Sequence, residues 1–222
     1  MELSEQEQVR RQSLQALRDL GIDPYPAAEY KVTGYSTEIK SAFVDRAEGD
    51  PEPDAEWFTG KPVSIAGRLM SKRIMGKASF IELQDSKGRI QVYVSRDDIQ
   101  EPVAEGEQPT TPGQQMYNTV FKKLLDIGDF IGIQGFVFRT QMGEISVHAQ
   151  NLTVLSKSIR PLPIVKYKDG VAYDGFNDPE QRYRQRYVDL VVNDGVKDTF
   201  LKRATILRTM RQVFDEAGYT EV

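Results

Sequence analysis

The stretch Pro62–Val94, PVSIAGRLMSKRIMGKASFIELQDSKGRIQVYV, decides the fold of this chain. It contains three runs, VSIAGRL, ASFIELQ and RIQVYV, in which apolar and polar residues alternate, and a period of two is typical of half-buried β-strands. Between the second and third runs, DSKG is a hairpin turn signal. The stretch therefore predicts three antiparallel strands that follow one another as a meander.

A helix and two further strands are predicted downstream. In MYNTVFKKLLDIG the apolar residues recur at helical spacing, and the closing glycine suits a C-terminal cap. The strands DFIGIQGFVFRT and EISVHAQNLTVL follow. This order, with backbone freedom at Gly67, Gly132 and Gly135, predicts a five-stranded Greek-key OB barrel over residues 61–156. Another small barrel would suit the strand count, but the helix after the third strand favours the OB fold.

Segments of different composition flank the predicted barrel. Residues 1–60 are expected to form a helix that ends at Gly21, followed by an acidic loop that contains prolines. Residues 157–177 suit a linker, and residues 178–222 suit a basic helix from Pro179 followed by a longer amphipathic helix. The fold class is therefore mainly β with flanking helices. Because the chain stops where a strand is expected to begin, we expect a truncated natural domain.

The composition excludes several kinds of active site. The chain has no cysteine and a single histidine, His148, so it holds neither a disulfide nor a histidine dyad nor a multi-histidine metal site. We expect His148 to be a polar strand residue, and we predict no catalytic residue and no metal site. No apolar run approaches the roughly 18 residues of a membrane span, and the N-terminus lacks a signal peptide's apolar stretch. We therefore expect a cytoplasmic protein without a membrane partner.

The charge is distributed unevenly along the chain. A formal net charge of -4 argues against a protein that holds nucleic acid by bulk charge alone. Residues 1–60 contain 6 Lys/Arg against 13 Asp/Glu, whereas residues 61–100 contain 8 against 4. The basic excess therefore coincides with the first three predicted strands.

Side-chain alternation predicts which residues the barrel displays. If Ile81 and Leu83 point inward, Phe80 and Gln91 point outward, and the same rule places Glu144 outward. An outward aromatic ring with basic flanks on the second and third strands of an OB barrel suits the binding of unstacked bases. The basic residues expected near this ring are Arg68, Lys72, Arg73 and Lys77. Arg68, Lys72, Lys77 and the outward Arg89 are expected as additional RNA contacts.

Two alternatives stay open from the pattern alone. An outward aromatic ring also suits a residue that packs under the N-terminal helix or a loop, and the cations also suit an ordinary solvated face. Arg73 has the wrong parity for the outward set if the first strand runs unbroken. Its placement beside Phe80 therefore requires a bulge, or the end of the strand, near Ser71.

Five segments carry a family resemblance: SKRIMGKASFIELQD, RIQVYVSRDD, GEISVH, LSKSIRPLP and DPEQRYRQRYVDL. Together they resemble the N-terminal half of bacterial class II lysyl-tRNA synthetases, from about Leu14 onward. The resemblance implies that the barrel binds the anticodon stem-loop of tRNA(Lys), with Phe80 stacked on the central base and no DNA partner. Arg73, Gln91 and Glu144 match the family's contacts to the uridine-rich anticodon. Arg73 enters this set only through the resemblance.

The resemblance also implies a longer parent protein. The final helix and GYTEV resemble the start of motif 1, the dimer-interface element, which implies a homodimeric parent. Motifs 2 and 3, with the sites for ATP, Mg²⁺ and lysine, are expected beyond Val222, so we expect the 222 residues to be catalytically inactive and to need no cofactor. The loop after Gln100 departs from commoner members by its length, and its Glu101, Glu105 and Glu107 are expected to lie in solvent rather than to repel RNA.

Two other functions remain as alternatives to anticodon recognition. The barrel of a general single-strand-binding protein would stack any base, and such a protein has no need of the tail after Arg160. An oligomerisation unit would use the apolar helix within residues 196–222.

Overall fold

The structure is a computed structural model that describes residues 3–100, 115–163, 166–168, 171–173 and 175–222. The chain divides into two compact units, Met1–Pro161 and Leu162–Val222. The boundary between the units falls within the predicted linker. The predicted loop after Gln100, which carries Glu101, Glu105 and Glu107, lies outside the described residues.

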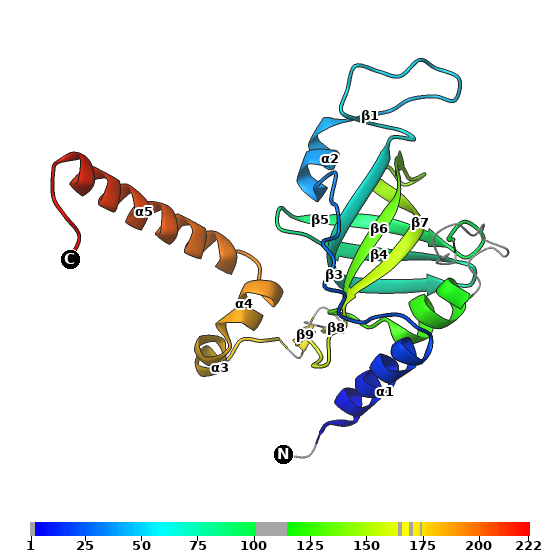
Figure 1. The fold of residues 1–222 in the computed structure, drawn as a ribbon, viewed down its shortest axis with the longest axis horizontal. Coiled ribbons are helices and arrows are strands. Elements are labelled where there is room, and N and C mark those ends of the chain that lie inside the picture. Colours follow the sequence, from blue (N-terminus) through cyan, green and yellow to red (C-terminus); the bar gives the residue numbers. More distant parts are fainter. Residues whose placement is uncertain (1–2, 101–114, 164–165, 169–170, 174) are drawn as a thin grey trace. The chain divides into compact units, whose positions relative to one another are not determined.

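A closed five-stranded barrel forms the centre of the first unit (Figure 1). Its strands are β3 (Pro62–Met75), β4 (Ala78–Gln84), β5 (Arg89–Ser95), β6 (Phe130–Arg139) and β7 (Ile145–Ser156). They follow one another around the barrel in the order β3, β4, β5, β7, β6, and β5 pairs with β7 in parallel while the other pairs are antiparallel. This is the strand order of an OB barrel, so the predicted Greek-key fold is confirmed.

The core of the barrel follows from the alternation in the strands. The inward residues predicted on β4 and β5 are at most 1% exposed, and those of β6 and β7 complete the same cluster. Members of this cluster include Ile81, Leu83, Ile90, Val92, Val94, Ile131, Ile133 and Val147. Because successive side chains of a strand point to opposite faces, their polar and aromatic neighbours are directed to the outer face.

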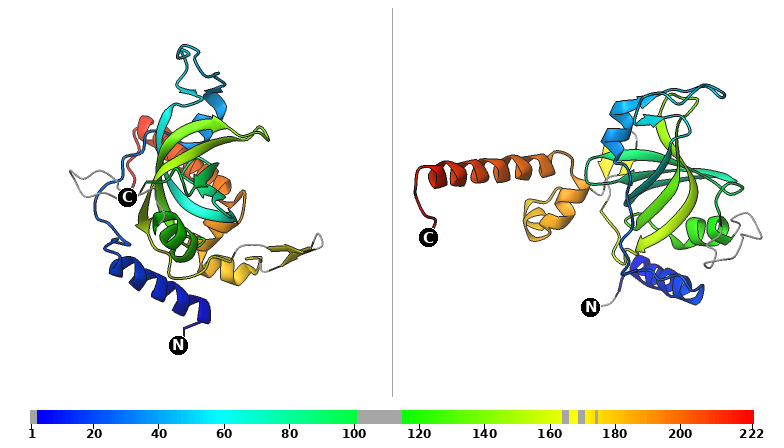
Figure 2. Two further views of the ribbon diagram at one scale, coloured as in Figure 1. Left: turned by 90° about the vertical axis from the view of Figure 1, so that its right-hand side faces the viewer. Right: turned by 45° about the horizontal axis from the view of Figure 1, so that its top comes forward.

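Two helices precede the barrel and lie toward opposite ends of it (Figures 1 and 2). Helix α1 (Glu5–Asp19) begins with a capping box between Ser4 and Glu7. The buried Arg10 of α1 donates to the carbonyl of Ile127 at 2.9 Å, and this bond ties the helix to the end of the barrel. Helix α2 (Ser36–Ala42) is shorter and lies toward the other end.

The helix between the third and fourth barrel strands is confirmed, but it is a π-helix, η1 (Met116–Leu124). It ends earlier than the predicted segment, and Leu125 donates back to the carbonyl of Val120. Its Tyr117 and Phe121 are fully buried and their rings stack at 5.5 Å. The Tyr117 hydroxyl also meets the Ser79 hydroxyl of β4 at 2.9 Å, so η1 closes one end of the barrel.

A short parallel pair, β1 (Phe43–Val44) with β2 (Trp57–Phe58), lies on either side of the acidic loop in the first sixty residues. Trp57 and Phe58 are each 3% exposed. The pair therefore anchors both ends of this loop on the first unit.

The second unit contains a hairpin of β8 (Lys166–Lys168) and β9 (Val171–Tyr173), followed by three helices. The prediction of one continuous basic helix from Pro179 is wrong. Gln185, with φ -121° and ψ 53°, separates two helices, α3 (Pro179–Arg184) and α4 (Arg186–Val192). The buried Asp189 carboxylate accepts from Arg182 at 2.9 Å and also binds Arg186. The Arg182–Asp189 ion pair therefore joins α3 to α4, whereas the Arg186–Asp189 pair lies within α4.

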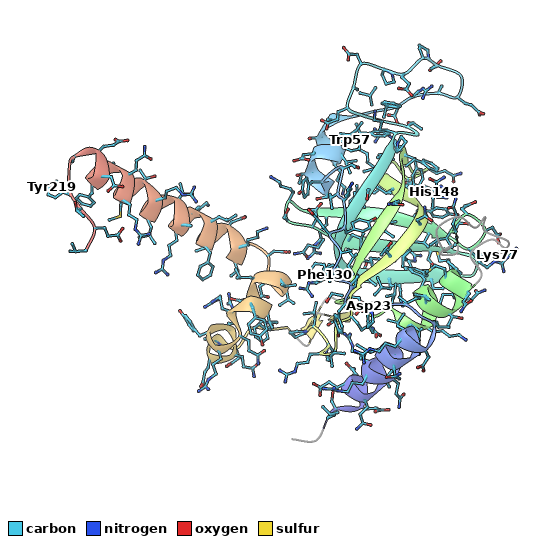
Figure 3. All side chains as sticks on the ribbon, in the orientation of Figure 1. Asp23, Trp57, Lys77, Phe130, His148 and Tyr219 are labelled. Atoms are coloured by element: carbon cyan, nitrogen blue, oxygen red, sulfur yellow. The ribbon has the colours of Figure 1, made fainter. Side chains whose placement is uncertain are left out.

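Helix α5 (Val196–Glu216) carries the predicted apolar residues on its surface. Of the predicted face, Leu207, Met210 and Phe214 are 41%, 50% and 54% exposed. The ring of Tyr219, labelled in Figure 3, packs edge-on against Phe214 at 5.8 Å. Among the helices of the described residues, none combines the length and the apolar character that a membrane crossing requires.

Candidate nucleic-acid interface

A bulge in β3 determines which of its basic side chains face outward. The register with β4 shifts between Leu69, which pairs with Leu83, and Ser71, which pairs with Glu82. Met70 is the extra residue, and an insertion of one residue exchanges the two faces of a strand beyond that point. Arg73 consequently pairs with the outward Phe80. The bulge that the predicted placement of Arg73 requires is therefore present.

The same bulge turns Lys72 toward the interior, which corrects its predicted position on the outer face. Lys72 pairs with the buried Ile81, and its ammonium donates to the carbonyls of Phe121 and Leu125 at 3.1 and 2.5 Å. Burial lowers the pKa of the Lys72 ammonium. Lys72 thus caps the end of η1, where orphan carbonyls need donors, and it lies outside the candidate interface.

The other three predicted basic flanks make contacts outside the cavity that Phe80 lines. Arg68 donates to the carbonyl of Gly128 at 2.9 Å and its guanidinium lies 4.2 Å from the ring centre of Phe130. Arg89 pairs with Glu82 at 3.2 Å, on the outer face but farther along the strands. Lys77 occupies the turn between β3 and β4 and is well exposed. None of the three lines the cavity described below, and whether they contact RNA stays a prediction.

Aromatic side chains form a row across the outer face of the barrel. The registers align Phe80 of β4, Tyr93 of β5, His148 of β7 and Phe136 of β6. The rings of Phe80 and Tyr93 are 5.3 Å apart, Tyr93 and His148 are 4.9 Å apart, and His148 and Phe136 are 4.8 Å apart. His148 of β7 is labelled in Figure 3. Phe138 lies beside this row, 6.2 Å from Tyr93.

A cavity of about 890 Å³ opens on this face and brings the four predicted anticodon residues together. Arg73, Phe80, Gln91 and Glu144 all line it. Phe80 is half-buried, rests against Tyr93 and lines the cavity. The size falls within the range of about 300–1,000 Å³ typical of small-ligand sites, and a nucleobase fits such a space.

Hydrogen bonds orient the polar groups of the cavity. The Gln91 Oε1 accepts the hydroxyl of the buried Ser146 at 2.9 Å, which leaves the Gln91 amide N–H₂ as the end directed to a ligand. One carboxylate oxygen of Glu144 pairs with Lys40 of α2 at 2.8 Å. Within the described part of the chain, Arg73 has no carboxylate partner. The cavity thus combines oriented donors, an anionic acceptor and aromatic surface.

The structure adds residues that the sequence reasoning did not assign to the site. Tyr93, Phe138, His148 and Lys40 line the cavity as well. The period-two pattern carried a signal for Tyr93 and His148, because both alternate with buried residues. His148, which we expected to be an ordinary polar strand residue, contacts Asp98 through Nε2 at 3.0 Å and lies inside the aromatic row. The sequence carried no signal for Lys40, which reaches the cavity from outside the barrel.

The cavity offers surfaces for stacking and hydrogen bonding, and no metal site accompanies it among the residues that the structure describes. Comparison with known proteins agrees with this chemistry. Residues 63–155 match the family described as OB-fold nucleic acid binding domain. The matched segment contains all five barrel strands except the first residue of β3 and the last residue of β7.

The relatives extend the match over the whole chain. A lysine–tRNA ligase of Porphyromonas gingivalis (strain ATCC BAA-308 / W83) is 63% identical over 224 residues, which cover 100% of this chain and 35% of the relative. The chain is thus similar over its whole length to the N-terminal part of a lysine–tRNA ligase. The lysine–tRNA ligase of Azobacteroides pseudotrichonymphae genomovar. CFP2 is 57% identical over 99% of this chain and 40% of its own length.

A third lysine–tRNA ligase, from Christiangramia forsetii (strain DSM 17595 / CGMCC 1.15422 / KT0803), is 53% identical over 100% of this chain and 35% of its own length. The chain therefore spans between 35% and 40% of the length of the lysine–tRNA ligases that it matches. Within the chain, the barrel is the part that matches the OB-fold nucleic acid binding family.

Proposed function

We propose that the cavity on the barrel holds the uridine-rich anticodon of tRNA(Lys), with Phe80 stacked on the central base. The observation that carries this proposal is the convergence of Arg73, Phe80, Gln91 and Glu144, from three strands and a turn, on one cavity. A base stacked on an aromatic ring gains about 1–3 kcal/mol, but stacking discriminates little between bases. Selectivity therefore depends on the polar groups around the ring.

The polar groups match the edge of uracil. That edge presents an N–H donor between two carbonyl acceptors, and RNA-binding proteins read such edges by hydrogen bonds to unstacked bases. Gln91 offers an amide donor to a carbonyl, Glu144 offers a carboxylate acceptor to the N–H, and Arg73 offers a donor to a carbonyl or a phosphate. Cytosine has an unprotonated ring nitrogen at the place of this N–H, so it would meet the Glu144 carboxylate unfavourably.

We further propose that the parent protein is a class II lysine–tRNA ligase that acts as a cytoplasmic homodimer. It would activate lysine with ATP and Mg²⁺ as lysyl-adenylate and transfer it to tRNA(Lys). The share of the relatives that this chain spans supports placing that chemistry outside the 222 residues, which would then form no lysyl-adenylate by themselves. The barrel makes and breaks no bonds in this scheme, and its contribution is selection of the tRNA by binding.

The proposal is tested by titrating the chain with anticodon stem-loops that carry UUU or CCC, and with single-stranded oligo-U and oligo-C. An anticodon reader prefers the UUU loop to the CCC loop. Equal affinities for all four RNAs would overturn the proposal and support the general single-strand binder, which the row of aromatic rings favours. Absence of binding at low salt would contradict both functions.

A further inference from the structure

Helix α2 is fixed firmly against the barrel although it precedes the OB-fold segment. The backbone N–H and the hydroxyl of Ser36 donate to the two carboxylate oxygens of Asp85 at 2.6 and 2.8 Å. Ser36 and Ile39 are fully buried, and Ile39 belongs to the barrel's hydrophobic cluster. A hydrogen-bonded start and a buried apolar side chain hold this helix in one position, and the residue after Ile39 is Lys40.

Lys40 reaches the cavity from this fixed helix and binds Glu144, which is 104 residues away in the sequence. Its ammonium lies 2.8 Å from Glu144 Oε1, and the two side chains are 38% and 48% exposed. An exposed ion pair contributes little to stability, about 0–1 kcal/mol. The pair does, however, restrict the orientation of the Glu144 carboxylate, which lies just before β7.

The ion pair gives the two carboxylate oxygens of Glu144 different partners. Lys40 engages Oε1, so Oε2 is the oxygen available to a ligand in the cavity that Lys40, Phe80, Gln91 and Glu144 all line. A group that is already oriented loses less conformational freedom when it binds, which favours the ligand that matches its direction. The matching group is a base N–H at the edge of the cavity.

We propose that Lys40 is a positioning residue that orients the Glu144 carboxylate toward the base and thereby sets the preference for uridine over cytidine. This inference rests on the proposed function, because it assumes that a pyrimidine edge occupies the cavity. Lys40 acts through Glu144 and needs no contact with RNA. Residues outside the OB-fold segment would therefore take part in reading the anticodon.

The test measures affinities of the full 222-residue chain for UUU and UCU anticodon stem-loops. Four variants are compared with the natural sequence: Lys40→Met, Lys40→Arg, Glu144→Gln and the Lys40→Met/Glu144→Gln double variant. Lys40→Met should reduce the UUU-over-UCU preference by about threefold to tenfold. Lys40→Arg should restore it, and the double variant should show no loss of preference beyond that of Glu144→Gln.

Lys87→Met is the matched control, since it removes the same charge from the barrel turn beside α2, and Lys87 does not line the cavity. It should leave the preference unchanged. A loss of affinity in Lys40→Met that is equal for both loops and persists in the Glu144→Gln background would overturn the inference, because Lys40 would then bind the RNA directly. An unchanged preference in Lys40→Met would overturn it too. If the natural chain itself shows no preference for UUU over UCU, the proposed function fails and the inference falls with it, an outcome visible before any variant is made.

Discussion

Arg73 lies opposite Phe80 across β3 and β4, although the parity of an unbroken β3 would place Arg73 on the inner face. The single inserted residue, Met70, changes the side of every later residue of the strand. As a result, the guanidinium and the aromatic ring share one cavity, while the neighbouring Lys72 turns to the carbonyls at the end of η1. One bulge thus places the adjacent cations Lys72 and Arg73 in different surroundings.

Replacing each of these cations by methionine should separate stability from RNA binding. Lys72→Met should lower the free energy of unfolding by about 1–3 kcal/mol, because it leaves buried carbonyls without a donor. Arg73→Met should change it by no more than about 0.5 kcal/mol, because the side chain is exposed and has no ion pair among the described residues. Urea unfolding of both variants checks this difference.

In stem-loop titrations, Arg73→Met should have the larger effect of the two variants. Arg73→Met should weaken binding of the UUU stem-loop by about 1.5–3 kcal/mol, as expected for a lost charge-assisted hydrogen bond, whereas folded Lys72→Met should bind nearly as the natural chain does. Stronger loss of affinity in Lys72→Met than in Arg73→Met would contradict the assignment of the two faces.

Phe80→Ala should weaken binding of the UUU stem-loop by about 1–3 kcal/mol through loss of stacking. Phe130→Ala is the matched control, because Phe130 is a partly exposed ring on the same barrel that packs against Arg68 away from the cavity. The control should leave the affinity unchanged. Fluorescence anisotropy with a labelled stem-loop measures both, and equal affinities for Phe80→Ala and the natural chain would show that the ring does not stack on the RNA.

Gly135→Ala should destabilise the barrel, because a Cβ at this position would lie 1.8 Å from the backbone oxygen of His148. β6 and β7 approach closely at this point, next to the register shift between Gln134 and Gly135. Separating them costs about 1–3 kcal/mol as overpacking does, and it moves His148 in the aromatic row. Gln134→Ala, on the exposed neighbouring position, provides the control in thermal unfolding. A melting temperature of Gly135→Ala equal to that of the control would contradict this account.

The ionised carboxylate of Glu7 should stabilise the folded chain at neutral pH, and this stabilisation should be lost at acid pH. The backbone N–H and hydroxyl of Ser4 donate to Glu7, and these bonds lower the pKa of its carboxyl from the usual 4.5. A carboxyl with a lowered pKa in the folded state stabilises that state above its unfolded pKa and ceases to do so as the pH falls through its folded pKa.

Unfolding of the natural chain and of Glu7→Gln, followed from pH 7 down to about pH 3, checks this expectation. The natural chain should be the more stable at pH 7. The difference should begin to shrink as the pH falls below 4.5 and should vanish only below the folded pKa of Glu7, which lies lower. Glu5→Gln, in the same turn but outside the capping box, should match the natural chain throughout. A difference that is independent of pH would exclude ionisation of Glu7 as its cause.

Much of the barrel and part of the site could be predicted because alternation is a local property. Ile81 and Leu83 are buried and Phe80 and Gln91 face outward, as the period of two predicts. The continuity of the helix after Pro179 could not be predicted, since Gln185 breaks it at a position without a proline or glycine. The domain boundaries and the RNA contacts of the site residues stay predictions.

The sequence by itself determined the positions of the strands, their inward core residues and the outward direction of Phe80 and Gln91, because these follow from which neighbours are apolar. Only the tertiary structure decided that Arg73 faces the cavity while Lys72 does not, and that Lys40 meets Glu144. The physical reason is that a bulge is visible only in the register between two strands. An ion pair between residues 104 positions apart likewise exists only once the barrel has brought α2 and the start of β7 together.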